Sequence, residues 1–138
     1  MNKLPRLEEA FKNAKNVWLT TFDEKGDEVD RQMTNYNEDP YAEMWFPTWT
    51  DTRKVRHLKR RPDALLTFPA EEEDKFYRIQ GTVRIADEET TYEKWKWWYL
   101  SWVPGDGSKY GLTGSHGWDN RAILLFTPEL AFKMDKPE

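Results

Sequence analysis

The sequence contains no cysteine among its 138 residues, so disulfide bonds and thiolate chemistry are excluded. It also lacks a long apolar run, and no positively charged start precedes a hydrophobic segment. These two absences argue against a membrane span and a secretory leader. We therefore expect a cytoplasmic protein.

The chain has no excess of positive charge. With 25 acidic and 21 basic residues its net charge is -4, so no global positive field attracts nucleic acid or an anionic membrane. An anionic ligand must therefore bind a local basic cluster. Although 33% of the residues are charged, eight tryptophans and an aromatic content of 15% supply apolar surface that disordered chains lack. We expect one folded domain over residues 1–138.

Hydrophobic periodicity predicts three helices and seven strands. The expected helices are 5–15, a short one that is capped by Thr50 or Asp51 and ends before Pro62, and one from 87 to 102. The expected strands are 17–22, 28–36, 43–48, 63–68, 75–86, 121–127 and 131–134. Many strands with few helices favour a closed or partly open antiparallel barrel over a parallel sheet.

Two residues predict irregularities in this barrel. Pro47 lacks an N–H group, so its strand is expected at a sheet edge or a bulge. Gly81 interrupts an alternating strand, which is typical of a bend or bulge where a barrel closes.

A set of cations and hydroxyls recurs at three places that this barrel could bring together. The segments are Arg31-Gln32-Met33-Thr34, Trp45-Phe46-Pro47-Thr48 and Thr52-Arg53-Lys54. Cations in the first turn of a helix are electrostatically unfavourable unless an anion compensates them, and a phosphate monoester would do so. From the charge pattern alone, Arg53 and Lys54 are more simply explained as solvated side chains beside Asp51.

The order of these segments resembles the flavin-binding half of the pyridoxamine 5'-phosphate oxidase-like family, of the general stress protein 26 type. The resemblance continues through the Gly81 strand, the Trp102-Val103-Pro104-Gly105 segment and Thr127-Pro128-Glu129, so it covers nearly the whole chain. It implies a mainly β fold, an antiparallel FMN-binding split β-barrel with about three short helices.

The resemblance also implies a cofactor site and a partner. Carried over, Arg31 and Lys54 bind the FMN phosphate, and Thr52 and Arg53 assist. The flavin ring would be bordered by Gln32, Met33, Thr34, Pro47, Thr48 and Trp49. Family members bind flavin between two barrels, so a homodimer with flavin at the subunit interface is expected. Within the family, a deazaflavin or haem can replace FMN.

The sequence departs from true pyridoxamine 5'-phosphate oxidases at two points. It stops at Glu138 without their C-terminal Arg-x-His substrate-binding segment, and Pro47 stands where a Tyr is common. We therefore expect no oxidation of vitamin B6.

Three functions remain open at this stage. The first is an oxidoreductase in which FMN passes electrons between a reduced nicotinamide and an unknown substrate. The second is a non-catalytic flavin-binding or stress-related module, which needs the same cofactor residues. The third, an aromatic-rich barrel that binds carbohydrate or protein, leaves the cluster of Arg31, Arg53 and Lys54 without a role.

No other residue carries a recognisable chemistry. His57 and His116 lack partners at metal-ligand spacing, and we expect His57 on the exposed face of its helix and His116 in a loop. No nucleophile or acid/base pair is assigned. In the tryptophan-rich helix we expect Trp95 to pack in the interior, whereas Trp102 and the 104–120 segment receive no assignment.

Overall fold

The computed structural model describes residues 1–50, 52–102 and 121–136, with the main chain only for residues 96–102. The described chain contains three helices, which are α1 (Leu7–Asn13), α2 (Arg53–Arg60) and α3 (Glu88–Trp102). Its strands are β1 (Asn16–Phe22), β2 (Glu28–Thr34), β3 (Met44–Trp49), β4 (Asp63–Pro69), β5 (Lys75–Ile85) and β6 (Arg121–Asp135).

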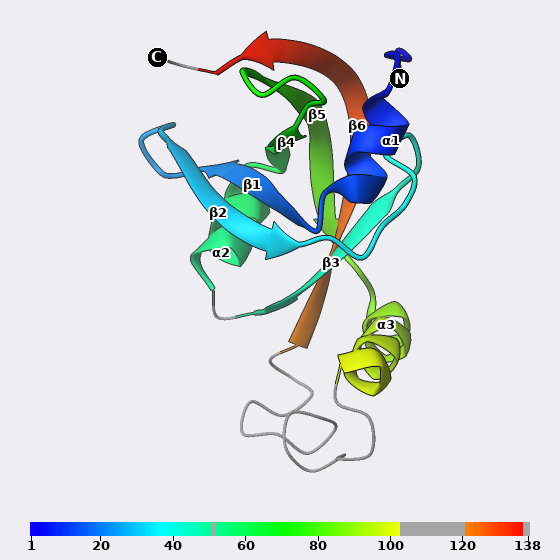
Figure 1. The fold of residues 1–138 in the computed structure, drawn as a ribbon. Coiled ribbons are helices and arrows are strands. Elements are labelled where there is room, and N and C mark those ends of the chain that lie inside the picture. The colour runs from blue at the N-terminus through cyan, green and yellow to red at the C-terminus, as the bar shows by residue number, and fades with distance from the viewer. Residues whose placement is uncertain (51, 103–120, 137–138) are drawn as a thin grey trace.

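The six strands form one antiparallel sheet in the order β2-β1-β4-β5-β6-β3. The sheet curls into a half-barrel, as Figure 1 shows, and this confirms the predicted split-barrel fold. β2 and β3 are its two edge strands although they follow one another in the sequence. The edge position of β3 agrees with the expectation for Pro47, because an edge strand tolerates the missing N–H group.

The prediction of two separate strands at the C-terminal end is wrong. β6 runs without interruption from Arg121 to Asp135 and pairs with β5 along the whole length of that strand. The register shifts where Gln80 pairs with Leu130 and Gly81 with Pro128, so one extra residue, Glu129, is accommodated in β6. Pro128 therefore lies at a bulge, where its missing N–H group does not end the strand.

Gly81 lies at this bulge, as the sequence predicted, because the two strands approach each other closely there. A Cβ atom on Gly81 would overlap the main-chain oxygen of Thr127 and lie 2.8 Å from the ring of Phe126. Neither group can move without disturbing the β5–β6 pairing or the core.

We predict that Gly81→Ala lowers the free energy of unfolding by about 1–3 kcal/mol or more, since overpacking at a backbone contact forces the strands apart. Urea unfolding followed by tryptophan fluorescence measures this loss. Gln80→Ala, at the exposed neighbouring position, is the control and should change stability little. A Gly81→Ala protein as stable as wild type would contradict the close approach.

The helices are shorter than the periodicity predicts at two places. α1 begins at Leu7, because Arg6 adopts a left-handed conformation with φ 65° and Pro5 therefore lies before the helix. α2 has Thr52 at its N-cap position. The predicted N-cap at Thr50 or Asp51 is therefore wrong by one or two residues. The predicted inward face of α2 is confirmed, since Val55 and Leu58 are buried.

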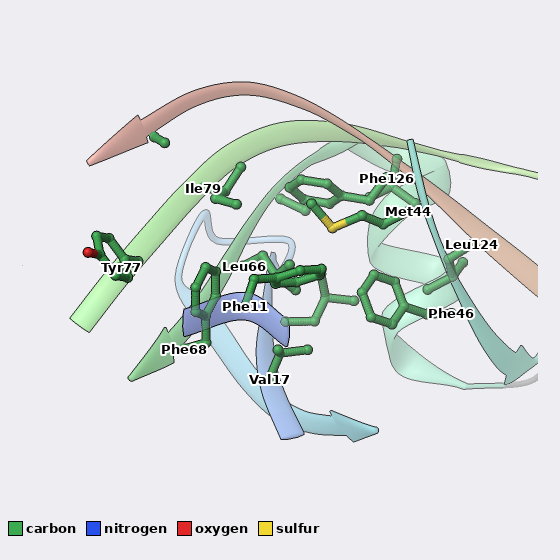
Figure 2. Packing of buried hydrophobic residues seen from close by; sticks show 14 of the residues in the cluster. Phe11, Val17, Met44, Phe46, Leu66, Phe68, Tyr77, Ile79, Leu124 and Phe126 are labelled. Carbon is green, nitrogen blue, oxygen red and sulfur yellow. The ribbon is translucent and has the colours of Figure 1, made fainter. Parts of the chain in front are cut away.

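The core fills the concave side of the curled sheet. Phe11 of α1 meets Phe68 edge-to-face at a centroid distance of 5.3 Å, and Phe68 contacts Tyr77 at 5.7 Å. Figure 2 shows these rings together with apolar side chains from β1, β3, β4, β5 and β6, including Val17, Met44, Phe46, Leu66, Ile79, Leu124 and Phe126. A smaller cluster of Ala86, Trp95, Ile123 and Leu125 joins α3 to the convex side of β6.

None of the described helices is long and apolar enough to cross a membrane.

A network of polar contacts links the β4–β5 connection to β5, to β6 and to the segment before α1. The hydroxyl of Tyr77 lies 2.7 Å from a carboxylate oxygen of Glu71 and 3.1 Å from the main-chain oxygen of Pro5. The ammonium of Lys133 donates to Glu71 at 2.9 Å. This hydrogen bond, followed by the one from Tyr77, lowers the pKa of Glu71 from 4.5 to about 2.

We predict that Glu71→Gln destabilises the fold at neutral pH and that its deficit against wild type shrinks on acidification. A carboxyl whose pKa is depressed on folding stabilises above its unfolded value of 4.5, and this stabilisation is lost as the pH falls towards about 2. Unfolding by urea at several pH values measures the deficit. Glu73→Gln in the same loop is the control, and equal deficits for the two variants at all pH values would refute the role of Glu71.

Candidate functional site

The curl of the sheet brings its two edges to one pocket. β2 and β3 supply the walls, and α2, which follows β3, begins beside them. The pocket has a volume of about 290 Å³ and is lined by Gln32, Met33, Thr34, Tyr36, Pro47, Thr48, Trp49, Lys54 and Trp95. Seven of the ten residues that the sequence analysis selected therefore line one pocket, and the other three, Arg31, Thr52 and Arg53, lie outside this lining.

Successive side chains along β2 and β3 alternate between the two faces of the sheet, and this decides which of them are buried. On β3, Thr48 is buried, whereas Pro47 and Trp49 point to the opposite face and are half-buried. On β2, Met33 is half-buried against the core, while Gln32 and Thr34 on the other face are exposed. The pocket is therefore lined by side chains from both faces of the sheet, at the gap between the two edge strands.

Aromatic rings that the sequence analysis did not assign to the pocket complete it. Trp95 of α3 packs on Trp49 with ring centroids 4.9 Å apart, and its Nε1–H donates to the main-chain oxygen of Ala122 at 3.2 Å. Trp95 is only 4% exposed, which confirms its predicted packing role. Tyr36 stacks on Trp45 at 5.5 Å with an interplanar angle of 19°. Only the tertiary fold places Tyr36 and Trp95 beside β3, and no sequence motif indicated it.

Positive charge gathers at the α2 end of the pocket. Burial lowers the pKa of Lys54, and the guanidinium of Arg31 lowers it further. The pKa of Arg31 is likewise lowered by burial and then by Arg53. Within residues 1–50, 52–102 and 121–136, no ion pair joins any of these three side chains to a carboxylate. The cluster therefore combines mutual repulsion with partial desolvation, which an anion would relieve.

The first turn of α2 adds to this positive potential. It contains no acidic residue, and the hydroxyl of Thr52 donates to the main-chain oxygen of Trp49 at 2.9 Å, so it does not cap the helix. Arg53 is exposed and lines a neighbouring pocket of about 300 Å³. The other residues of its lining are the basic or imidazole side chains Lys25, Arg56, His57 and Arg60 and the acidic side chains Asp23 and Glu24. Arg53 thus adds charge to the cluster from outside the pocket, as its effect on the pKa of Arg31 shows.

The expectation that His57 lies on an exposed helix face is wrong. Its side chain is 5% exposed because α2 packs on β1, and its Nδ1 lies 2.9 Å from Oγ1 of the fully buried Thr21. Arg31 donates from Nη1 to the same hydroxyl at 2.7 Å. Burial, followed by the charges of Arg31 and Arg53, lowers the pKa of His57. Alternation along β1 places Thr21 on the core face, but nothing in the sequence pairs it with His57.

The described residues contain no group of three or more His, Asp or Glu side chains that could hold a metal ion. His116, Trp102 and the 104–120 segment, which the sequence analysis considered, lie outside the residues or side chains that the structure describes.

Comparisons with known proteins agree with this architecture. Residues 2–112 match the family model described as pyridoxamine 5'-phosphate oxidase like, and the chain belongs to this family. No curated protein sequence matches the chain.

Solved structures with the same fold include three informative ones. A Clostridium acetobutylicum protein related to general stress protein 26 is 24% identical, with a TM-score of 0.67 over 92% of this chain and 84% of that one. An FMN binding protein from Nostoc punctiforme, related to pyridoxamine 5'-phosphate oxidase, is 14% identical, with a TM-score of 0.65 and coverages of 98% and 87%. An F420 reductase is 16% identical, with a TM-score of 0.67 and coverages of 91% and 94%. At these identities the similarity establishes the fold.

Proposed function

We propose that this chain, as a single domain of residues 1–138, is an FMN-binding flavoprotein. The observation that carries the proposal is the convergence of side chains from β2, β3 and α2 on one pocket whose α2 end is positively charged. In the proposed site, Arg31 and Lys54 bind the phosphate with help from Thr52 and Arg53. The ring is bordered by Gln32, Met33, Thr34, Pro47, Thr48 and Trp49.

The positively charged end fits a phosphate monoester in charge and in donor chemistry. A phosphate carries a charge of about -1.5 to -2 at neutral pH and accepts several hydrogen bonds. Arg31 and Lys54 are strong donors, and the main-chain N–H groups at the start of α2, which the Thr52 side chain does not cap, supply further donors with a favourable helix dipole. Both side chains have pKa values lowered by burial and by like charge, so an anion would relieve an existing strain.

The aromatic end fits a flat ring system only in part. Trp49 and Pro47 offer apolar surface, and Gln32 and Thr34 offer hydrogen-bonding groups at the rim. A volume of about 290 Å³ is at the low end of the roughly 300–1,000 Å³ that small-molecule sites occupy. We infer that a second copy of the chain covers the exposed part of the flavin, and we propose a homodimer.

Bound FMN supplies hydride and electron transfer, whereas the protein supplies binding, orientation and shielding from water. We propose an oxidoreductase that uses reduced nicotinamide or a similar donor and a small-molecule substrate. A non-catalytic flavin-binding or stress-related module would use the same residues. Anaerobic addition of reduced nicotinamide separates the two, because it should bleach the flavin of the oxidoreductase and leave the spectrum of the module unchanged.

We predict that the purified protein, or the protein after incubation with FMN, shows the two-band visible absorbance of a bound flavin. A bound deazaflavin or haem would give a different spectrum, so the same measurement identifies these alternatives. A colourless protein that takes up no added FMN would refute the proposed function.

We predict that Lys54→Ala weakens FMN binding about tenfold or more. A charge-assisted hydrogen bond contributes roughly 1.5–3 kcal/mol, and Lys54 would form one with the phosphate. Titration by flavin fluorescence measures the affinity. Riboflavin, which lacks the phosphate, should bind Lys54→Ala and wild type almost equally.

Lys59→Ala is the matched control, because Lys59 is exposed at the other end of the same helix. Without ligand, the stability of Lys54→Ala should match that of wild type, since a cation near a helix N-terminus is not stabilising there. Equal losses for FMN and riboflavin would indicate general damage to the pocket, and unchanged affinities would indicate a solvated Lys54. Either result would remove the phosphate assignment.

We predict that the protein sediments as a dimer in analytical ultracentrifugation when FMN is bound. The open pocket and the half-exposed edge strands leave a flavin partly uncovered in one copy. A monomer that retains FMN at micromolar concentration would contradict the proposed interface.

A further inference from the structure

We propose that Thr21 and His57 are positioning residues that hold the guanidinium of Arg31 in place for an anionic ligand. The proposal rests on the phosphate site proposed above and adds two residues to it. Neither residue lines the flavin pocket, so any effect on binding must pass through Arg31.

The three side chains form a continuous chain of hydrogen bonds behind the pocket. Nη1 of Arg31 donates to Oγ1 of Thr21 at 2.7 Å, and the same oxygen lies 2.9 Å from Nδ1 of His57. The residues come from three elements, β2, β1 and α2. Thr21 is fully buried and His57 is 5% exposed, so water does not readily replace either contact.

The donor and acceptor properties of the three side chains determine the direction of these hydrogen bonds. Arg31 can only donate, so the Thr21 oxygen accepts from it. The hydroxyl proton of Thr21 is then free to point at Nδ1 of His57, provided that Nδ1 is unprotonated and Nε2 carries the proton. This requires a neutral imidazole, and the surroundings favour one.

The groups that act on the charge of His57 come from α2, from β2 and from the turn after β1. Among the described groups, the guanidinium groups of Arg31, Arg53 and Arg60 disfavour an imidazolium, whereas the carboxylate of Asp23 favours it. Burial is the largest influence and also disfavours the charge. A neutral acceptor is therefore the form of His57 that fits beside the cations.

Fixing Arg31 before the ligand arrives would improve binding. An arginine side chain loses rotamer entropy when it is immobilised, and a side chain that is already held loses less of it on binding. Arg31 is on an edge strand, where fewer neighbours restrict it, so the hydrogen bond to Thr21 provides much of its restraint. Supporting contacts of this kind are typical of precise binding sites.

The test compares FMN and riboflavin binding in variants of the whole 138-residue chain. Thr21→Val keeps the shape but removes the hydroxyl, and it should weaken FMN binding about fivefold while riboflavin binding stays unchanged. Thr21→Ser should restore FMN binding to near the wild-type value. Thr20→Val is the matched control, because Thr20 is a buried neighbour on β1 whose hydroxyl bonds to Asp30 instead, and it should leave FMN affinity unchanged.

A double-mutant cycle tests whether the effect passes through Arg31. In an Arg31→Ala background, Thr21→Val should cause no further loss of FMN affinity, because the group that Thr21 positions is absent. Equal losses from Thr21→Val with and without Arg31, or equal losses for FMN and riboflavin, would overturn the positioning role.

NMR of the imidazole nitrogens tests the hydrogen bonds without any ligand. The chain has only two histidines, so His57→Asn assigns the signals of His57 by their loss. We expect an Nε2–H tautomer at neutral pH and a shift of the Nδ1 resonance in Thr21→Val. An Nδ1–H tautomer, or no shift, would overturn the chain of hydrogen bonds.

The outcomes separate this inference from the proposed function. If wild type and Thr21→Val bind FMN equally well, the positioning role is refuted and the proposed flavin site is unaffected. Wild-type protein that takes up no FMN would refute the proposed function, and with it the phosphate role of Arg31, whatever the NMR signals show.

Discussion

The pairing of β5 with β6 is the constraint on which the rest of the structure depends. These are the two longest strands, and their shared bulge at Gly81 and Glu129 bends the sheet in the middle of the pair. Because the sheet bends there, its two edge strands curl round the same core instead of diverging. The core rings of Phe11, Phe68 and Phe126 fill the space that this curvature encloses.

The incomplete closure of the barrel leaves an opening between its two edge strands. β2 and β3 end the sheet, so the side chains at this gap are only partly covered. α2 follows β3 in the sequence, and its first turn places Lys54 at the gap and Arg53 at the neighbouring pocket. One opening thus combines apolar surface from β3, rim polar groups from β2 and the positive end of a helix. This combination suits a ligand that is flat at one end and anionic at the other.

The cation cluster is also electrostatically unfavourable for the fold. Arg31, Arg53 and Lys54 repel one another, and the pKa values of Arg31 and Lys54 are lowered by burial and by this repulsion. Burial and the neighbouring guanidinium groups lower the pKa of His57, which disfavours a further positive charge beside them. Functional sites often retain such unfavourable arrangements, because the ligand supplies the missing opposite charge. The arrangement of these cations therefore supports the proposal that an anionic ligand binds here.

The sequence by itself determined the fold class, most helix and strand positions, the edge position of Pro47 and the bulge at Gly81, because these follow from local periodicity and backbone chemistry. On the strength of a family resemblance it also selected ten site residues, of which seven line one pocket. Only the tertiary structure decided that β6 continues through Pro128, since the bulge that permits it depends on pairing with β5. Only the tertiary structure buried His57 against Thr21 and placed Trp95 beside Trp49. Such contacts join residues far apart in the chain, and no local pattern encodes which distant partner a side chain will meet.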